Sequence, residues 1–234
     1  MSKFPFFAAA ILAALPQISS AAEVTDGTVG VSYSQFTGDD VSDLNKTSLT
    51  GSLNVGFTRQ FSMQGDVSFN QYDFVDTNAN NVALHGIFHA NDSTVFGAYY
   101  GQNTGSGDRL DYYGLEAGHD FGQFGAEAYV SHASEDGVSG SLYGVSGRYA
   151  VNDTLGVNVA FDKLDVEGLD AHRAQIGVDY TISNAVTVSG DIGQAKVEST
   201  GSQTYVAIGA KLNFGKHKGA TFQQRDLTRI IPGG

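Results

Sequence analysis

Apolar and polar residues alternate along most of the chain between Thr28 and Phe214. In the stretch 206–214, for example, every second residue is Val, Ile, Ala, Leu or Phe, and the residues between them include Lys211 and Asn213. A period of two is typical of a β-strand with one apolar face, and helical periodicity is almost absent. The sequence therefore predicts an all-β fold of about twelve strands. They are expected at 29–34, 48–57, 63–70, 82–89, 95–100, 113–117, 124–130, 143–149, 155–162, 173–180, 186–192 and 206–214.

The connections between the predicted strands alternate between two kinds. Tight turns are expected near Arg59, Asp92, Gly122, Asn152 and Asn184. Longer polar loops are expected between these turns, at 37–45, 75–81, 102–109, 133–140, 163–170 and 198–203. Short and long connections that take turns are typical of an up-and-down meander whose two ends face different surroundings, and not of βαβ units. We therefore expect a closed antiparallel barrel with short periplasmic turns and longer extracellular loops.

Alternation alone does not say whether the apolar face points inward or toward lipid. The polar face consists mainly of Ser, Thr, Asn, Gln and Gly, and only 16% of the chain is charged, against about 25% in average soluble proteins. Twelve strands also enclose a wide interior, since about eight are enough for side chains to fill a barrel. Both observations favour an apolar outside and a polar lumen. A secreted soluble β-barrel or sandwich, with the opposite orientation, is the alternative.

Aromatic residues gather near the ends of the predicted strands, with aliphatic residues, Ala and Gly between them. Two such belts around an aliphatic band are typical of a transmembrane β-barrel, whose interfacial aromatics suit the membrane surface. A sheet that spans lipid must also close on itself, because lipid offers no hydrogen bonds. One belt lies beside the tight turns and includes Phe57, Phe61, Phe88, Phe121, Phe124, Tyr149, Tyr180 and Phe214, and the other includes Tyr33, Phe69, Tyr72, Tyr99, Tyr113, Tyr143 and Phe161.

The first 22 residues have the features of an export signal. Lys3 gives a positive start, residues 4–15 are mostly apolar, and small residues at Ser20 and Ala22 suit a cleavage site before Glu23. We expect residues 1–22 to be a signal peptide, residues 23–214 the barrel and residues 215–234 a basic tail.

Composition excludes several functions. The formal net charge of −12 argues against a nucleic-acid partner, which needs a basic face. The absence of cysteine excludes disulfides and cysteine-ligated metals. No cofactor and no metal site is expected.

The chain resembles a Gram-negative outer-membrane β-barrel protein of the porin type. The likeness covers Thr28 to Phe214 and depends on the export signal, the alternation, the rhythm of turns and loops, and the last strand, 205–214. It implies a monomeric or trimeric pore in the cell outer membrane for passive diffusion of small hydrophilic solutes or ions. It also implies outer-membrane lipids as neighbours, and a last strand with a terminal aromatic similar to the one that the barrel-assembly machinery reads.

Two features depart from large porins. Those proteins have 16 or 18 strands, and no loop here is long enough to fold into the lumen as a constriction. The chain also continues for twenty residues past Phe214 with a formal charge of +3, from Lys216, Lys218, Arg225, Arg229 and Asp226. Three interpretations of this tail remain open: a plug in the acidic lumen, a site for periplasmic partners, and a segment without fixed structure.

Charged side chains on the polar face are the candidate pore-lining residues, because rings of side-chain charge decide which ions enter a channel. Acidic residues outnumber Lys and Arg by six to three among them, so we expect a mild cation preference. Glu116, Glu127 and Arg148 fall on consecutive strands and are expected to meet across the wall, either as a cluster that sets selectivity or as ion pairs that fill the interior and fix the register. The candidates are Asp66, His85, His89, Glu116, Glu127, Arg148, Asp162, Arg173, Asp179, Asp191 and Lys211.

Two histidine patterns were weighed for other chemistry. His85 and His89 lie about 13 Å apart on one strand face, at about 3.3 Å per residue, which is too far to chelate one metal ion. His132 and Ser134 invite comparison with outer-membrane phospholipases, whose mechanism needs a serine nucleophile and a histidine base, but the neighbouring residues do not match. The chain is therefore expected to be a channel and not an enzyme. A closed barrel for structure or surface interaction is the main alternative, and a lipid hydrolase is the third.

Overall fold

The computed structural model describes residues 22–38, 44–73, 77–105, 108–135, 138–166, 169–197, 201–215 and 219–230. The predicted signal peptide lies outside these residues, apart from Ala22. Twelve strands and one short 3₁₀ helix make up the described part. Their bounds are β1 (Glu23–Phe36), β2 (Asn45–Gly56), β3 (Phe61–Tyr72), β4 (Thr77–His89), β5 (Thr94–Gly105), β6 (Asp108–Asp120), β7 (Phe124–Glu135), β8 (Val138–Ala150), β9 (Leu155–Val166), β10 (Leu169–Thr181), β11 (Val186–Val197), β12 (Gly201–Gly215) and η1 (Leu227–Ile230).

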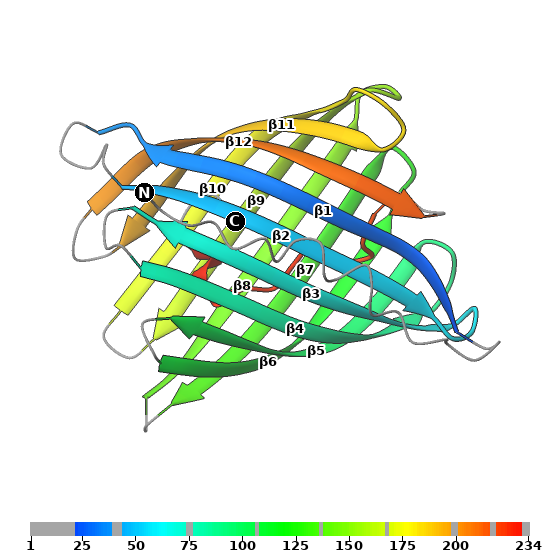
Figure 1. The fold of residues 1–234 in the computed structure, drawn as a ribbon, viewed down its shortest axis with the longest axis horizontal. Coiled ribbons are helices and arrows are strands. Elements are labelled where there is room, and N and C mark those ends of the chain that lie inside the picture. The colour runs from blue at the N-terminus through cyan, green and yellow to red at the C-terminus, as the bar shows by residue number, and fades with distance from the viewer. Residues whose placement is uncertain are drawn as a thin grey trace, which may run out of the picture.

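Each strand pairs antiparallel with the next along the chain, and the last pairs with the first (Figure 1). The closing ladder runs from Asp26 opposite Gly215 to Phe36 opposite Tyr205. Closure leaves no free sheet edge, which is the condition for crossing lipid with strands. The predicted closed twelve-stranded meander is confirmed. No helix in the described part of the chain is long and apolar enough to span a membrane.

The strands extend further than the alternation indicated at one end of the barrel. Gly105 still pairs with Asp108, and Val166 with Leu169, inside segments expected to be loops. The longer loops predicted at 102–109, 133–140 and 163–170 are therefore wrong, since two residues separate the strands at each of these places. The ladder continues there because neighbouring strands still supply hydrogen-bond partners, although both faces carry polar residues. We call this the loop end, and the opposite end, with the connections 57–60, 90–93, 121–123, 151–154 and 182–185, the turn end.

The outer face of the barrel is apolar. Leu115 and Ile208 are 63% and 65% exposed, as befits side chains that lipid and not protein would cover. Aromatic residues lie exposed toward both ends, including Phe61 and Phe88 at the turn end and Tyr113 at the loop end. Two members of the predicted belts are placed differently: Tyr72 and Tyr99 are only 4% exposed and face the lumen. Their strands keep the period of two, but these tyrosines fall on the inward positions.

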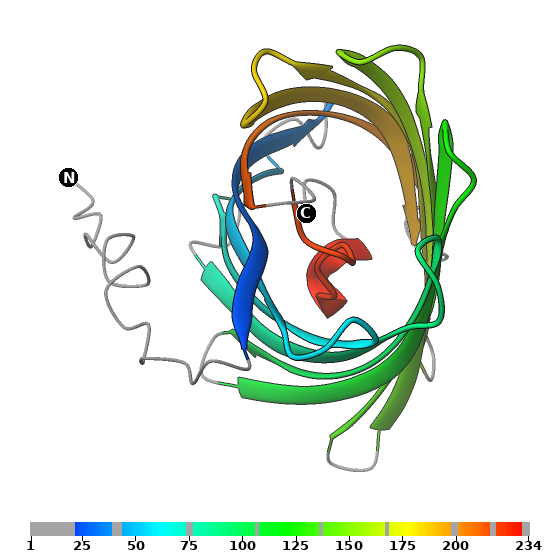
Figure 2. The ribbon, with the colours of Figure 1, turned by 90° about the vertical axis from the view of Figure 1, so that its right-hand side faces the viewer.

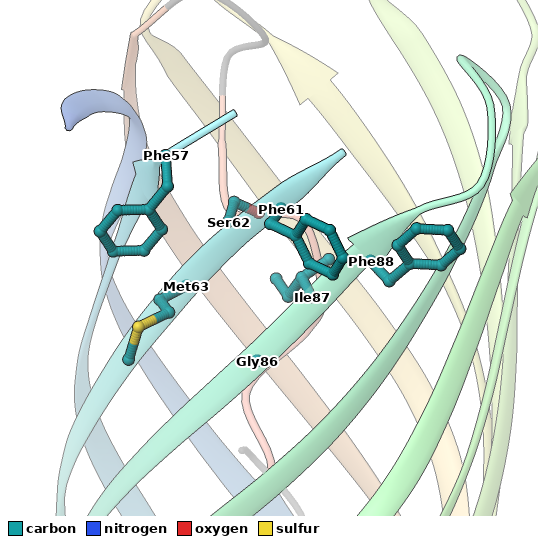
Figure 3. A pocket seen from close by; sticks show the side chains of 7 residues that line it. All are labelled: Phe57, Phe61, Ser62, Met63, Gly86, Ile87 and Phe88. Carbon is teal, nitrogen blue, oxygen red and sulfur yellow. The ribbon is translucent and has the colours of Figure 1, made fainter. Parts of the chain in front are cut away.

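A hollow on the outer face near the turn end shows the apolar surface in detail (Figure 3). Gly86 has no side chain, and Phe57, Phe61, Met63 and Phe88 surround it. The Phe61 and Phe88 rings pack against each other with their centroids 5.3 Å apart. Lipid would meet an almost wholly apolar surface here.

Tyrosines on the inward face lie flat across glycines of the neighbouring strand. Tyr129 stands opposite Gly144 in the ladder, and Tyr99 stands opposite Gly114. A Cβ atom at either glycine would overlap the tyrosine ring. The missing side chains therefore hold these rings against the wall, where the Tyr129 hydroxyl donates a hydrogen bond to Asp162 Oδ1 at 2.7 Å.

We expect Gly144→Ala to destabilise the barrel by about 1–3 kcal/mol, the usual cost of overpacking. The added methyl group displaces the Tyr129 ring and with it the hydrogen bond to Asp162. The measurement is the temperature at which the folded band is lost on SDS gel electrophoresis. Gly65→Ala is the matched control, because a Cβ atom there meets nothing within 4 Å. Equal midpoints for the two variants would contradict this role of the glycine.

Candidate functional site

All eleven candidate residues lie on the inward face of the barrel. Residues directly opposite each other in an antiparallel ladder share a face, so the pairing shows which residues of each strand point inward. Arg173 stands opposite Asp162, for example, and Asp191 stands opposite Gly177. The same face carries Asp66, His85, His89, Glu116, Glu127, Arg148, Asp179 and Lys211.

The described part of the tail, 219–230, lies inside the lumen (Figure 2). The chain leaves β12 at Gly215 with a φ of +100°, a conformation that glycine adopts without strain. A Cβ atom at this position would also collide with the carbonyl oxygen of Thr25. Gly215 therefore permits the turn that precedes the return of the chain into the barrel. Of the three interpretations of the tail, the structure corresponds to the plug.

The tail enters along β1, β2 and β3. Ala220 donates its backbone N–H to Thr28 Oγ1 at 3.3 Å. Gln64 then holds the backbone of Phe222 on both sides: its Oε1 accepts the Phe222 N–H at 3.1 Å, and its Nε2 donates to the Phe222 carbonyl at 2.9 Å. Gln64 is fully buried, so both groups of its amide need these partners.

Arg225 is the centre of the contact between tail and wall. Its Nε donates to Glu116 Oε2 at 2.7 Å and its Nη2 to Glu127 Oε2 at 3.1 Å. The guanidinium carbon lies 4.4 Å from the centroid of the Tyr129 ring. Burial lowers the pKa of the Arg225 guanidinium, but the charges of Glu127 and Glu116 outweigh burial and raise this pKa above its ordinary value. The arginine therefore stays charged in its buried position.

Three buried side chains hold Glu116 from behind. His85 Nδ1 lies 2.7 Å from Glu116 Oε1, and His85 Nε2 lies 3.0 Å from Asp66 Oδ2. Gln64 Nε2 donates to Asp66 Oδ1 at 3.0 Å. The imidazole and both carboxylates are fully buried. This chain of contacts fixes the orientation of the Glu116 carboxylate toward Arg225.

Asp226 and Arg229 make further polar contacts deeper in the lumen. The Asp226 carboxylate accepts hydrogen bonds from Ser68 at 3.0 Å, Asn70 at 3.1 Å and Asn103 at 2.6 Å. Arg229 Nε lies 3.4 Å from Asp162 Oδ1. Each charged side chain in the described tail segment 219–230 thus meets polar side chains of the wall.

The helix η1 completes the plug with apolar contacts. Leu227 and Ile230 pack against a buried cluster that includes Tyr112, Ala133 and Leu142. The Tyr112 hydroxyl also donates a hydrogen bond to the Arg225 carbonyl. The wall of the lumen thus offers the tail both polar partners and an apolar patch that receives Leu227 and Ile230.

The docked tail divides the lumen into two parts. In the loop-end half, the inward side chains of Lys46, Tyr72, Tyr112, Arg173 and Tyr205 are each at most 4% exposed, and we call this part the plugged half. At the turn end, the inward faces of β8–β12 remain accessible to solvent, and we call this part the vestibule. Its residues include Ser146, Arg148, Asn158, Asp179, Ser189, Asp191 and Lys211.

The structure corrects one predicted group of charges. Glu116 and Glu127 do meet, but around Arg225 of the tail and not around Arg148. Arg148 instead pairs with Asp179, with Nε 3.2 Å from Oδ2, and its side chain is 56% exposed. Arg148 lies at the turn end of β8, opposite Gly125, one pair beyond Glu127 on that face. Position on consecutive strands did not reveal this offset.

The two histidines of β4 have separate surroundings. His85 is part of the buried network, whereas His89 lies at the turn end with Nε2 2.8 Å from Ser62 Oγ. No group of three or more His, Asp or Glu side chains in the described ranges is placed to hold a metal ion.

His132 and Ser134 do not form a catalytic pair in the described structure. The hydrogen bond of His132 Nδ1 goes to Ser141 Oγ at 3.4 Å, and the imidazole packs on Tyr113, with the ring centroids 5.6 Å apart. His132 and Ser134 are two positions apart on one strand, about 6.6 Å along its axis at about 3.3 Å per residue.

Several residues that hold the tail were missed by the sequence interpretation. The prediction of lumen candidates rests on charge, and it therefore omits the uncharged residues Gln64, Asn70, Asn103 and Tyr112. Their inward positions in the alternation were the available signal. Nothing in the spacing of residues indicated which of them would meet the tail.

Residues 13–200 match the sequence pattern of the Gram-negative porin family. The chain belongs to this family. Porins of this family are outer-membrane channels for small solutes, and the polar lumen and apolar outer face described above fit that role. A comparison with curated proteins found no match.

Solved structures of outer-membrane channels share the fold. The KdgM porin superposes with a TM-score of 0.62 at 11% identity, over 80% of this chain and 99% of KdgM. The NanC porin gives 0.60 at 11% identity, over 79% and 98%. An outer membrane channel from Pseudomonas putida F1 gives 0.57 at 12% identity, over 86% and 100%. At such identities the likeness establishes the fold alone.

Proposed function

We propose that this porin is a passive channel for small hydrophilic solutes or ions whose conductance is restricted by its own docked tail. The observation that carries the proposal is the polar lumen with a solvent-accessible vestibule at one end and residues 225–230 of the tail as a plug at the other. Solutes enter the vestibule and cross when the segment 225–230 leaves the plugged half. Swelling of liposomes in sugars of graded size tests whether the lumen passes solutes at all.

A weak cation preference is part of the proposal. The six acidic and three basic residues among the candidates leave an excess of three carboxylates within that set, and Arg225, Arg229 and Asp226 of the tail reduce this excess to two. Within the vestibule the charges are balanced, with Asp179 and Asp191 against Arg148 and Lys211. The excess therefore comes from the part of the wall that the tail covers.

Substitutions in the vestibule should shift the ion preference in opposite directions. We expect Asp191→Asn to lower the cation preference and Lys211→Gln to raise it, because both side chains face the water through which ions pass. The measurement is the reversal potential of the full chain in a KCl gradient across a planar bilayer. The unsubstituted chain is the reference, and an anion preference in that reference would overturn the proposed selectivity.

Further parts of the proposal concern export and the membrane. We propose that residues 1–22 are removed on export and that 205–214 is read by the barrel-assembly machinery. Outer-membrane lipids would cover the apolar face, with an acyl chain in the hollow around Gly86 (Figure 3). Assembly into a homo-oligomer is the remaining proposed partner interaction, and nucleic acid is not among the proposed partners.

The docked tail also favours a second candidate, a closed barrel without transport. The burial of Lys46, Tyr72, Tyr112, Arg173 and Tyr205 around the plugged half is the observation that supports it. This candidate would be selected if neither the full chain nor a chain that ends at Gly215 passes sugar or current after reconstitution.

A further inference from the structure

The site that holds Arg225 is built almost entirely by the barrel wall. Glu116 is on β6, and Glu127 and Tyr129 are on β7. From the described part of the tail, the Phe222 ring centroid lies 5.8 Å from the guanidinium carbon, and the Gln223 backbone N–H donates to Glu127 Oε2 at 3.2 Å. Two carboxylates meet two different nitrogens of one guanidinium, and an aromatic ring stacks on its face. We call Glu116, Glu127 and Tyr129 the guanidinium site.

We propose that the guanidinium site is a ligand-binding site of the lumen, and that solutes with a guanidinium group, such as arginine and short arginine-containing peptides, compete there with Arg225. The proposal rests on the proposed channel function, since competing solutes arrive through the lumen. In this interpretation Arg225 is a tethered ligand, and a free ligand of the same chemistry displaces its side chain and so weakens the docking of the tail.

The geometry favours a guanidinium over an ammonium group. Nε and Nη2 of Arg225 point to separate carboxylates, at 2.7 and 3.1 Å. A guanidinium presents its donors in a rigid planar fork and stacks on aromatic rings, whereas an ammonium is a compact, strongly hydrated charge. A lysine side chain would therefore serve the two carboxylates and the Tyr129 ring less well.

The site is held in shape by groups other than its ligand. His85 lies between Glu116 and Asp66, and Gln64 donates to Asp66. These contacts do not involve Arg225, so they persist when the arginine side chain is absent. A site that is already oriented binds its ligand without an added ordering cost.

Solutes can reach the site from the vestibule. The Glu127 side chain is 21% exposed, whereas the Arg225 and Glu116 side chains are at most 1% exposed. Gln223, next to the site in the tail, is exposed and donates to Ser146 Oγ of the vestibule at 3.2 Å. The Glu127 carboxylate thus stands at the border between the vestibule and the buried part of the site.

Free arginine must compete with a tethered one. A short flexible tether gives an effective concentration in the millimolar range, so we expect free arginine to act on the wild type at millimolar concentrations or above. In Arg225→Ala the tethered competitor is gone while Asp226 and Arg229 keep their partners on the wall. Arginine should then act at a lower concentration than on the wild type.

The experiment compares L-arginine with L-lysine and with L-citrulline. The side chain of citrulline has nearly the same shape as that of arginine but carries no charge. In the full-length Arg225→Ala variant in detergent, arginine is expected to raise the thermal midpoint of unfolding, lysine less so and citrulline not at all. Adding Glu116→Gln and Glu127→Gln should abolish the effect of arginine. In planar bilayers, arginine but not citrulline should raise the KCl current through the wild type.

Equal midpoints of Arg225→Ala in arginine and in citrulline would overturn the proposal, as would an effect of lysine as large as that of arginine. Should Arg225→Ala fail to fold, Arg225→Lys keeps the buried charge and undergoes the same comparison.

The outcomes separate the proposed channel function from the proposed guanidinium site. A chain that conducts KCl but does not distinguish arginine from citrulline retains the channel function and loses the guanidinium site. A chain that never conducts loses the channel function, and the midpoints in detergent still decide whether the site binds guanidinium.

Discussion

A chain that ends at Gly215 is expected to show a several-fold higher single-channel conductance in KCl than the full chain. The segment 225–230 fills the plugged half of the lumen, and removal of the tail leaves the twelve strands and their closing ladder complete, with Phe214 still in β12. The measurement is single-channel recording in planar bilayers. Cation preference should rise as well, because Glu116, Glu127 and Asp162 lose the arginines that face them.

The matched control keeps the full length of the chain. The double variant Arg225→Gln and Arg229→Gln removes the charges that face Glu116, Glu127 and Asp162 but keeps a tail of the same length. We expect an intermediate conductance with frequent transitions, since the tail then docks weakly. A truncated chain with unchanged conductance would show that the tail does not limit the flow of ions.

The second large effect is expected from Asp162→Ala, which should destabilise the barrel by about 3–5 kcal/mol, the usual cost of breaking a buried ion pair. Asp162 Oδ2 accepts from Arg173 Nη2 at 2.7 Å, Oδ1 accepts from Tyr129, and Arg229 lies beside it. The Arg173 side chain is 1% exposed, so it would remain charged in a buried position without its carboxylate. The measurement is unfolding by urea in detergent or lipid.

Asp179→Ala is the matched control for Asp162→Ala. It removes the same group two strand positions from the turn end of β10, but its partner Arg148 is 56% exposed and can turn into water. Exposed ion pairs contribute less than about 1 kcal/mol, so the control should unfold close to the wild type. Similar losses for the two variants would contradict the distinction between the plugged half and the vestibule.

The tail occupies the place that an inward-folded loop would take in a larger porin. No loop of this chain is long enough for that role, and the sequence therefore predicts a smaller channel, with the tail as one candidate for a plug. The structure supplies the constriction from the other end of the polypeptide. The tail follows the last strand, so its departure from the lumen would unpair no strand, whereas a loop is held at both ends by the barrel.

A structural feature of this protein can be predicted from the sequence when it depends on residues that are close together in the chain. The face of a strand is set by alternation between adjacent residues, so β12 and the inward position of Lys211 could be assigned from a few neighbours. The prediction of the aromatic belts misplaced Tyr72 and Tyr99, because it relied on aromatic residues near strand ends and not on the face that each residue occupies. Strand ends were also missed where both faces became polar.

By itself, then, the sequence determined a closed barrel of twelve antiparallel strands, an apolar outside and a charged polar inside, because each of these properties is repeated locally in every strand. Only the tertiary structure decided which charges meet. Arg225 reaches Glu116 across 109 residues of chain, and Phe222 reaches Gln64 across 158. Such pairs depend on the register around the whole barrel and on the path of the tail through its interior, and no local pattern of residues encodes either one.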